Sequence, residues 1–203
     1  MLEESSLRVV PCSLRKANDF VEVYHRHNIR TARNGGKFAI AAAIGSEVVG
    51  VAIVGNPLSA TYMDGFTAEI LRVCTAPSAP KNCNSLIYGA CRRVWFGMGG
   101  SRIVTYTLTT ESGISLRASG WRMTATIKGH DPKTWGKKTI QDRREQEIIA
   151  REKFRWESFN SASTPLSKLN WPKKVEEAGE RWEKETESRR EGRRERMEAK
   201  KNS

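Results

Sequence analysis

The sequence lacks both a long apolar run and any closely spaced cysteine pair. Its longest apolar stretch covers residues 38–44, far short of the roughly 20 residues that a membrane-spanning helix needs. No C-x-x-C pair occurs, and the first residues do not follow the charged-then-apolar pattern of a secretory leader. The four cysteines are Cys12, Cys74, Cys83 and Cys91. We therefore expect reduced thiols, a cytoplasmic location and no membrane partner.

Acidic residues are scarce relative to basic ones. The 203 residues include 35 Lys and Arg but only 23 Asp and Glu, which gives a net charge of +12. Residues 173–203 hold 11 basic and 9 acidic residues, so this tail carries +2 and residues 1–172 carry +10. Such a charge favours nucleic acid, an acidic protein surface or a phosphorylated cofactor as partner. A generally basic proteome is the alternative explanation.

Two kinds of apolar spacing alternate along residues 7–128. Apolar runs bounded by turn residues predict strands, and apolar residues three and four apart predict helices. Ser13 is placed to cap the first helix. The expected strands are residues 7–10, 38–44, 48–54, 69–75, 103–106 and 121–128, and the expected helices are residues 14–24 and 85–98 and a short one within 112–121. This order predicts an α/β fold with a mixed sheet.

The composition changes after residue 129. Residues 143–156 are highly charged and predict a helix, and residues 160–172 hold Ser, Thr, Asn and two prolines, which is typical of a linker. From residue 173, Glu and Lys or Arg recur four apart on a predicted solvated helix. We therefore divide the chain into a body (1–129), a basic helical extension (130–159) and a linker with a charged C-terminal helix (160–203).

Three segments carry a resemblance to a known fold: "EILRVCTAP", "KNCNSLIYGACRR" and "RIVTYTLTTESGISLRASGW". The element order, with a loop and helix after the fourth strand and a Gly-aromatic end to the next helix, resembles the GNAT acyltransferases. More narrowly, over roughly residues 7–128, the segments resemble the phage Mom-type DNA-modification proteins and their prophage-encoded relatives. The resemblance implies a mostly antiparallel sheet with flanking helices, whose two central strands, residues 69–75 and 103–107, splay apart.

The resemblance also implies a cofactor site. GNAT proteins bind acetyl-CoA or a related acyl-CoA. The pantetheine arm of this cofactor inserts between the splayed strands, and its pyrophosphate lies at the start of the next helix. The residues that this implies for cofactor binding are Arg72, Val73, Cys74, Lys81, Asn82, Asn84 and Ser85. The phosphate loop departs from the family because it has no glycine. Leu116 stands where the family often has a proton-donating tyrosine, and Thr109 where it often has asparagine.

Four residues near the splayed strands are candidates for proton transfer. Glu69 is a candidate general base that takes a proton from the acceptor amine. Tyr106 and Ser112 are candidate donors of the proton that Leu116 cannot supply, and Glu111 is a second candidate base. The competing interpretations are a solvent-facing charge for Glu69 and structural hydroxyls for Tyr106 and Ser112.

A further set of residues predicts a nucleic-acid surface. Basic residues with interleaved aromatics suit phosphate contact and base stacking, and modifying a base within a duplex requires an aromatic or apolar wedge to flip it out. The candidates are His25, His27, Arg30, Lys37, Phe38 and Trp135, with Phe38 and Trp135 as wedges. The alternative is a solvated charged surface. The two histidines diverge on a helix and have no third ligand at metal spacing, so no metal site is expected.

Three functions remain open from the sequence. The first, implied by the narrower resemblance, is a transferase that modifies the amino group of adenine in phage DNA inside a bacterial host cell and so protects it from restriction. The second is an acetyl-CoA-dependent N-acetyltransferase that acts on a protein or a small amine. The third is a GNAT-like binding module without catalysis. A dimer is possible in each case.

Overall fold

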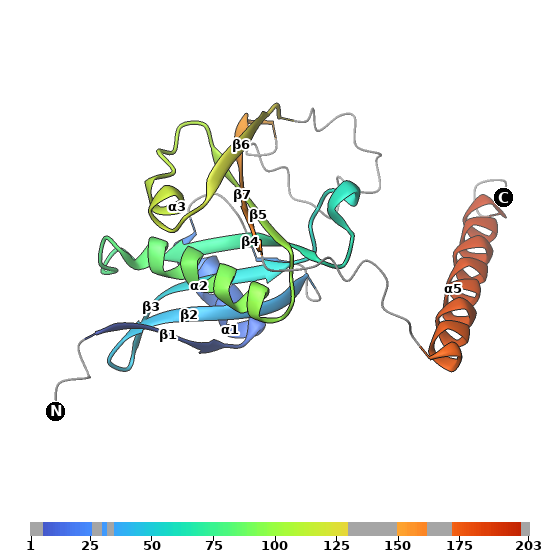
Figure 1. Cartoon of the computed structure of the whole chain (residues 1–203). Helices are drawn as coiled ribbons and strands as arrows, with labels where there is room; N and C mark the ends of the chain where they lie inside the picture. The colour runs from blue at the N-terminus through green and yellow to red at the C-terminus, as the bar shows by residue number, and fades with distance from the viewer. Residues whose placement is uncertain (1–5, 26–29, 32–34, 130–149, 162–171, 200–203) are drawn as a thin grey trace. The chain divides into compact units, whose positions relative to one another are not determined.

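The computed structural model describes residues 6–25, 30–31, 35–129, 150–161 and 172–199. Two compact units divide the chain, Met1–Pro165 and Leu166–Ser203. The elements, labelled in Figure 1, are β1 (Leu7–Cys12), α1 (Leu14–Tyr24), β2 (Gly36–Ile44), β3 (Glu47–Gly55), the 3₁₀ turn η1 (Ala60–Tyr62), β4 (Thr67–Thr75), α2 (Cys83–Gly97), β5 (Arg102–Leu108), α3 (Ile114–Ala118), β6 (Arg122–Ile127), β7 (Lys153–Phe159) and α5 (Lys173–Ala199).

The first unit is built on a seven-stranded sheet. Its strand order is β1-β2-β3-β4-β5-β7-β6. Among the described strands, β4 and β5 are the parallel neighbours, and every other pair is antiparallel. The sheet therefore confirms the predicted mixed, mostly antiparallel architecture.

Strand β7 corrects two predictions from the sequence. We expected a helix over residues 143–156 and a last strand at residues 121–128. Instead Lys153–Phe159 is a strand that pairs with β5 on one side and with β6 on the other, while residues 143–149 lie outside the described residues. The alternation of Phe154 and Trp156 with Arg155 and Glu157 is a two-residue period typical of strands. The high charge of the segment hides this period.

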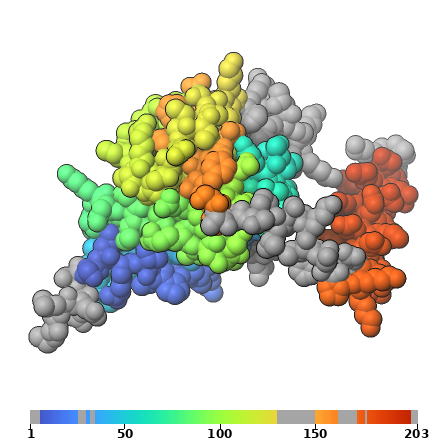
Figure 2. Space-filling model, viewed as in Figure 1, coloured from blue at the N-terminus to red at the C-terminus, as the bar shows by residue number. Residues whose placement is uncertain are grey.

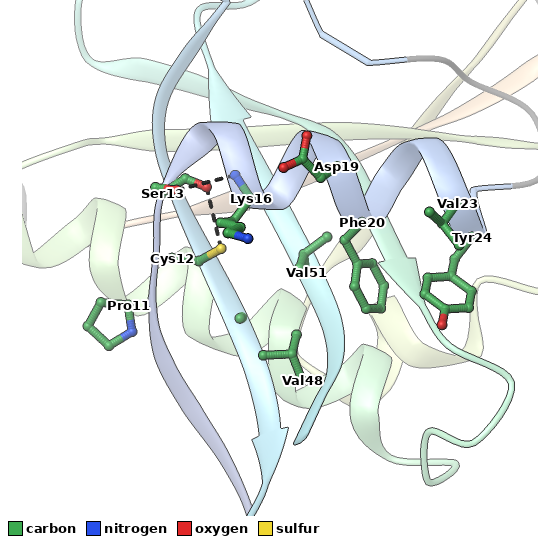
Figure 3. Close-up of a pocket in the computed structure, with 11 residues that line it drawn as sticks. Pro11, Cys12, Ser13, Lys16, Asp19, Phe20, Val23, Tyr24, Val48 and Val51 are labelled. Atoms are coloured by element: carbon green, nitrogen blue, oxygen red, sulfur yellow. Dashed lines mark hydrogen bonds between the residues drawn. The ribbon is translucent and has the colours of Figure 1, made fainter. Parts of the chain in front are cut away.

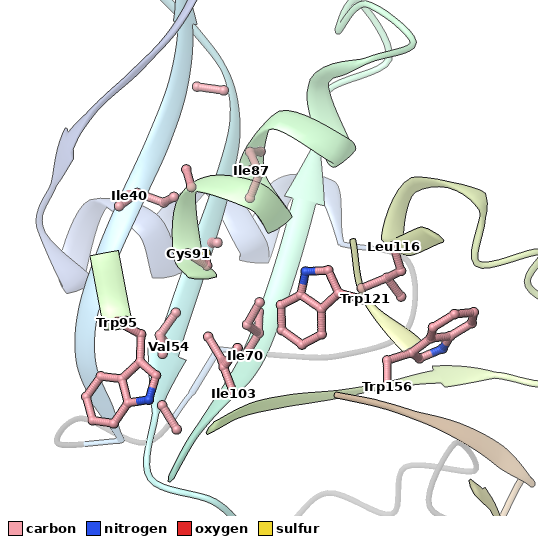
Figure 4. Packing of buried hydrophobic residues seen from close by; sticks show 14 of the residues in the cluster. Ile40, Val54, Ile70, Ile87, Cys91, Trp95, Ile103, Leu116, Trp121 and Trp156 are labelled. Carbon is pink, nitrogen blue, oxygen red and sulfur yellow. The ribbon is translucent and has the colours of Figure 1, made fainter. Parts of the chain in front are cut away.

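Helices cover both faces of the sheet. Ser13 caps α1 as predicted, because its Oγ accepts a hydrogen bond from the N–H of Lys16 at 3.2 Å. Helix α1 buries Ala17 and Val21 against β2, β3 and β4. Helix α2 packs on the opposite face, where Ile87 and Trp95 join the larger core cluster (Figure 4).

The larger cluster extends from α2 to α3 and the last strands. Leu116, Trp121 and Trp156 are each at most 3% exposed and pack in it together. The turn that enters α3 needs a glycine: Gly113 has φ +63°, and a Cβ there would overlap the ring of Trp156. The backbone conformation at Gly113 is therefore constrained by the ring of Trp156.

Strands β4 and β5 pair only at their beginnings. Their register joins Thr67 to Arg102, Ala68 to Ile103 and Glu69 to Val104, and no further pair follows. On its other side β4 bulges: Ile53 pairs with Arg72 and Val54 with Ile70, which leaves Leu71 without a partner. A bulge bends and twists its strand, so this one helps β4 to leave β5. The predicted splay is confirmed.

A side chain closes the ladder where the two strands part. The hydroxyl of Thr105 donates a hydrogen bond to the carbonyl of Ile70 at 3.1 Å, in a buried position. It thus replaces the backbone N–H that a continuing parallel ladder would have supplied.

The second unit contains α5, which confirms the predicted charged C-terminal helix. Most of its described side chains are exposed, and Glu185 and Arg189, four apart, lie 3.7 Å from each other. Exposed pairs of this kind stabilise a helix by only about 0.2–0.5 kcal/mol. Within the described residues, no helix is both long and apolar enough to cross a membrane.

Thr105→Val tests the closure of the ladder. Valine keeps the side-chain shape but leaves the buried Ile70 carbonyl without a donor, so we expect the free energy of unfolding, measured by urea denaturation, to fall by about 1–3 kcal/mol. Thr126→Val is the matched control, because Thr126 is exposed on β6, and it should shift that value by no more than about 0.5 kcal/mol. Equal losses in both variants would contradict the role given to the Thr105 hydroxyl.

Candidate active site

A buried carboxylate lies where β4 and β5 part. Glu69 belongs to the last pair of the parallel ladder and is only 4% exposed. Its Oε2 accepts a hydrogen bond from the N–H of Leu58 at 2.9 Å. Burial raises the pKa of Glu69 to about 7, while the Leu58 N–H and the positive charge of Arg72 act to lower it. Near neutral pH this carboxyl can both take up and release a proton, which is what a general base requires.

The loop between β3 and β4 delivers the Leu58 N–H to Glu69. Its end is fixed by Asp64, whose carboxylate accepts hydrogen bonds from the N–H groups of Phe66 and Thr67 and from the hydroxyl of Thr67. The same loop carries the η1 turn and with it Tyr62. The loop therefore forms part of the site, which the sequence did not indicate.

Arg72 lies near Glu69 on the same strand. The guanidinium donates a hydrogen bond to the carbonyl of Leu71 at 2.6 Å, within the bulge. Burial lowers the pKa of Arg72, and the charge of Glu69 raises it. We predicted that Arg72 would grip a phosphate or a carboxylate of a ligand. Its contacts in the structure include the Leu71 carbonyl in the bulge and the charge of the candidate base, and the ligand contact stays a prediction.

Tyr106 is the second ionisable group of this cluster. It stands two residues beyond Val104 on β5 and pairs in register with Arg155. Burial is the main cause that raises the pKa of Tyr106 to about 12, and the charge of Glu69 adds to the rise. The phenol therefore keeps its proton at neutral pH and can donate it. The structure thus brings together Glu69, Arg72 and Tyr106 from two different strands.

Arginine and aromatic side chains gather beside this cluster. The guanidinium groups of Arg102 and Arg155 lie over the ring of Tyr62, at 5.2 and 5.6 Å from its centroid. Arg155 also forms an ion pair with Glu157 at 2.6 Å. The sequence prediction missed Arg155 and Glu157 because residues 143–156 were expected to be helical and no strand was expected through residue 157. The two-residue period of β7 was the signal that could have found them.

The beginning of α2 offers free donors for an anion. Among the described residues, nothing accepts a hydrogen bond from the N–H groups of Asn84 and Ser85, whereas that of Cys83 bonds to the carbonyl of Pro80 at 2.9 Å. Lys81 is exposed beside them. Asn82 occupies the N-cap position, but its side chain makes no capping hydrogen bond. Unbonded N–H groups and the helix dipole make such an end suited to a phosphate.

Val73 and Cys74 have side chains in the core. Val73 packs against the α2-side cluster, and Cys74 is buried in the cluster under α1. Their predicted contact with a cofactor is therefore limited to the backbone of the β4 edge. Burial also makes Cys74 a packing residue rather than a reactive thiol.

Glu111 and Ser112 shape the turn after β5. A carboxylate oxygen of Glu111 accepts from the N–H of Leu108 at 3.2 Å, and Oγ of Ser112 accepts from the N–H of Ile114 at 3.5 Å. The charge of Glu111 helps to raise the pKa of Tyr88 on α2, not that of Tyr106. The structure thus groups these two candidates with the turn rather than with Glu69.

The predicted nucleic-acid residues do not form a common surface among those described. His27 and Trp135 lie outside the described residues. His25 ends α1, and Arg30 forms ion pairs with Asp19 and Glu22, which lie on α1, at 2.8 and 2.6 Å.

The other two described members of that set lie at the start of β2. Lys37 places its Nζ 5.4 Å from the ring centroid of Trp95. Phe38 packs against the α2-side core, so it does not project as a wedge for base flipping.

A separate groove of about 530 Å³ lies on the α1 side of the sheet. Figure 3 shows it between the end of β1, α1 and β3, where Phe20, Tyr24, Val48 and Val51 provide apolar walls. It includes none of the ionisable residues of the Glu69 cluster. Within the described part of the chain, no group of three or more His, Cys, Asp or Glu side chains is placed to hold a metal ion.

Comparison with known proteins supports the fold. No family model and no curated protein matches the sequence. Among solved structures, the ribosomal-protein-S18-alanine N-acetyltransferase of Escherichia coli is similar with a TM-score of 0.55 and 10% identity, over 82% of this chain and 100% of that one. An acetyltransferase from Bacillus subtilis in complex with CoA is similar with a TM-score of 0.52 and 14% identity, over 77% of this chain and 99% of that one.

A third similar structure names the fold family. The GNAT family acetyltransferase of Elizabethkingia anophelis, with acetyl-CoA bound, has a TM-score of 0.52 and 12% identity, over 76% of this chain and 98% of that one. The chain therefore has the GNAT acetyltransferase fold. No match of a family model or of a curated protein supports the narrower resemblance to the Mom-type proteins.

Glu69→Gln tests the burial of the carboxyl through the pH dependence of stability. In the unfolded chain Glu69 ionises near its ordinary pKa of 4.5, but in the folded protein only near 7. Between these values the unfolded state binds fewer protons, so wild-type stability falls as pH rises and then levels off. Glutamine does not ionise. The Glu69→Gln variant should therefore be no more stable than the wild type below pH 4.5. Above pH 7 its free energy of unfolding should exceed that of the wild type by about 3 kcal/mol, at 1.36 kcal/mol for each pKa unit.

Thermal or urea unfolding of both proteins at several pH values measures this difference. A stability difference that does not change with pH would show that Glu69 has an ordinary pKa in the folded protein.

Proposed function

We propose that the protein is an acyl-CoA-dependent N-acyltransferase in which Glu69 takes the proton of the acceptor amine. The observation that carries this proposal is the buried Glu69 carboxyl, with a pKa of about 7, where the parallel ladder ends. A base is most effective when its pKa lies near the working pH. The presence of CoA or acetyl-CoA in similar structures supports the choice of cofactor.

The chain has suitable groups for both ends of an acyl-CoA. Beyond Glu69, the β5-facing edge of β4 pairs with none of the described strands, so its backbone can pair with the amides of the pantetheine arm. The N–H groups of Asn84 and Ser85, with the nearby charge of Lys81, are the candidates for the pyrophosphate. When bound, the thioester would supply the acyl group.

Two protein groups then account for the protons. Glu69 receives a proton from the acceptor nitrogen, and the water-poor surroundings that raise its pKa make it a stronger base than an exposed carboxylate. Leu116, buried at 1% exposure, has no proton for the departing sulfur. Tyr106 keeps its proton at neutral pH and is the candidate donor.

The preferred acceptor is a protein or small-molecule amine. An alkyl amine is protonated at neutral pH and must lose a proton to become nucleophilic, a task that suits a base with a pKa near 7. Two of the similar structures are named as N-acetyltransferases or acetyltransferases for alanine of ribosomal proteins. The second candidate is the amino group of adenine in DNA, which the charge of +10 on residues 1–172 favours.

The pH dependence of turnover tests Glu69 as the base. Wild-type kcat/KM should rise with pH and level off above an apparent pKa of about 7. Glu69→Gln should lack this rise and lower kcat by about 10²–10⁴-fold, with CoA affinity unchanged in calorimetry. Tyr106→Phe should also lower kcat but keep the rise near pH 7. If Glu69→Gln keeps full activity, the base is another residue.

Lys81→Glu tests the proposed pyrophosphate site. The substitution puts a negative charge beside the free N–H groups of α2, so we expect CoA affinity in calorimetry to fall about tenfold or more. Lys128→Glu makes the same charge change at another exposed position and should leave the affinity nearly unchanged. Equal losses would indicate only a general charge effect.

Mass spectrometry of products decides the acceptor. Nucleosides from cells that express the wild type or Glu69→Gln should be identical if the acceptor is an alkyl amine, and peptide or amine substrates should gain an acyl group from acetyl-CoA in vitro. A deoxyadenosine of altered mass in wild-type cells alone would select the DNA reaction instead.

A further inference from the structure

Among the described residues, the core contains one buried side-chain donor without a hydrogen-bond acceptor. Trp121 is 3% exposed, and its Nε1 is buried without a hydrogen-bond partner among the described residues. The other two core tryptophans are satisfied: Trp95 donates to the carbonyl of Arg102 at 2.8 Å, and Trp156 donates to Oγ1 of Thr107 at 2.9 Å. An unpaired buried N–H loses its hydration without compensation, so the Trp121 indole lacks a partner that its neighbours have.

The ring lies beside the point where β4 and β5 separate. Figure 4 draws it between β4 and Leu116 of α3, with the nitrogen on the edge turned away from Trp156. It shares a core cluster with Ile70 and Ile103. Ile103 belongs to the short ladder, and Ile70 is the first residue of β4 beyond it.

The surroundings hold the indole in this position. Leu116 is fully buried beside it, and the ring of Tyr88 meets it edge-on with centroids 6.1 Å apart. The backbone N–H of Trp121 is bonded to the carbonyl of Leu116 at 3.0 Å, which fixes the residue to the end of α3. The donor is therefore pre-positioned rather than free to turn toward another acceptor.

We propose that Nε1–H of Trp121 donates a hydrogen bond to a carbonyl oxygen of the ligand that enters between β4 and β5. An indole N–H is only a donor, so its missing partner is an acceptor, and an amide carbonyl of the pantetheine arm has this chemistry. This inference rests on the proposed acyl-CoA function. Trp121 is then a positioning residue for the cofactor arm.

Trp121→Phe separates this role from simple packing. Phenylalanine keeps an aromatic ring but removes the donor, so affinity for CoA in calorimetry should fall about tenfold. Affinity for adenosine 3′,5′-bisphosphate, which lacks the pantetheine arm, should stay the same. Trp156→Phe is the matched control: it makes the same change of volume in the same cluster, should not alter CoA affinity, and should lose more stability because it breaks a hydrogen bond that exists.

A spectroscopic measurement reports on the donor itself. In ¹H–¹⁵N spectra the indole signal of Trp121 is identified by its absence in Trp121→Phe. Addition of CoA should move this signal downfield, as expected when the N–H gains an acceptor, and adenosine 3′,5′-bisphosphate should not.

The outcomes distinguish the inference from the function on which it rests. If the wild type binds CoA but Trp121→Phe binds it equally well and the signal does not move, the inference is wrong and the proposed function stands; this is also the result expected if a buried water is the partner. If the wild type does not bind CoA, both are wrong.

Discussion

The early end of the ladder between β4 and β5 is the constraint on which the rest of the structure depends. Parallel strands normally continue their hydrogen bonds, but here pairing stops at Glu69 and Val104. The bulge at Leu71 bends β4, and the Thr105 hydroxyl satisfies the first carbonyl left unpaired. The bulge bends β4 away from β5, and the hydroxyl replaces one lost backbone hydrogen bond at a buried position. The separation of the strands is thus built into both of them.

Two groups near this separation are kept in states that cost stability. Glu69 is buried with a raised pKa, and the indole of Trp121 is buried without an acceptor in the described part of the chain. Neither state is needed for the packing of the core, because the remaining cluster is apolar and the other indoles are hydrogen-bonded. Such local costs commonly occur where a protein binds or reacts, and these two lie where the strands separate.

Part of the fold and of the candidate site could be predicted from the sequence. The strands β2 and β3, the cap at Ser13 and helix α2 follow from local patterns, and the splay followed from the resemblance. The strand β7 was not predicted, because the charges of residues 143–156, Lys153 and Arg155 among them, suggested a helix. Glu69 was expected as a base, but its raised pKa depends on burial under a loop whose placement no local pattern predicts. Predicting that the Trp121 indole is unpaired would require the position of every neighbouring acceptor.

The most direct test of the account is the pKa of Glu69 itself. A ¹³C-NMR titration of the side-chain carboxyl carbons, with the Glu69 signal assigned by its loss in Glu69→Gln, measures it in the folded protein without a substrate. The account predicts an apparent pKa of about 7. A value at or below the ordinary 4.5 would mean that Glu69 is ionised and stabilised at neutral pH, and would contradict its role as a buried base.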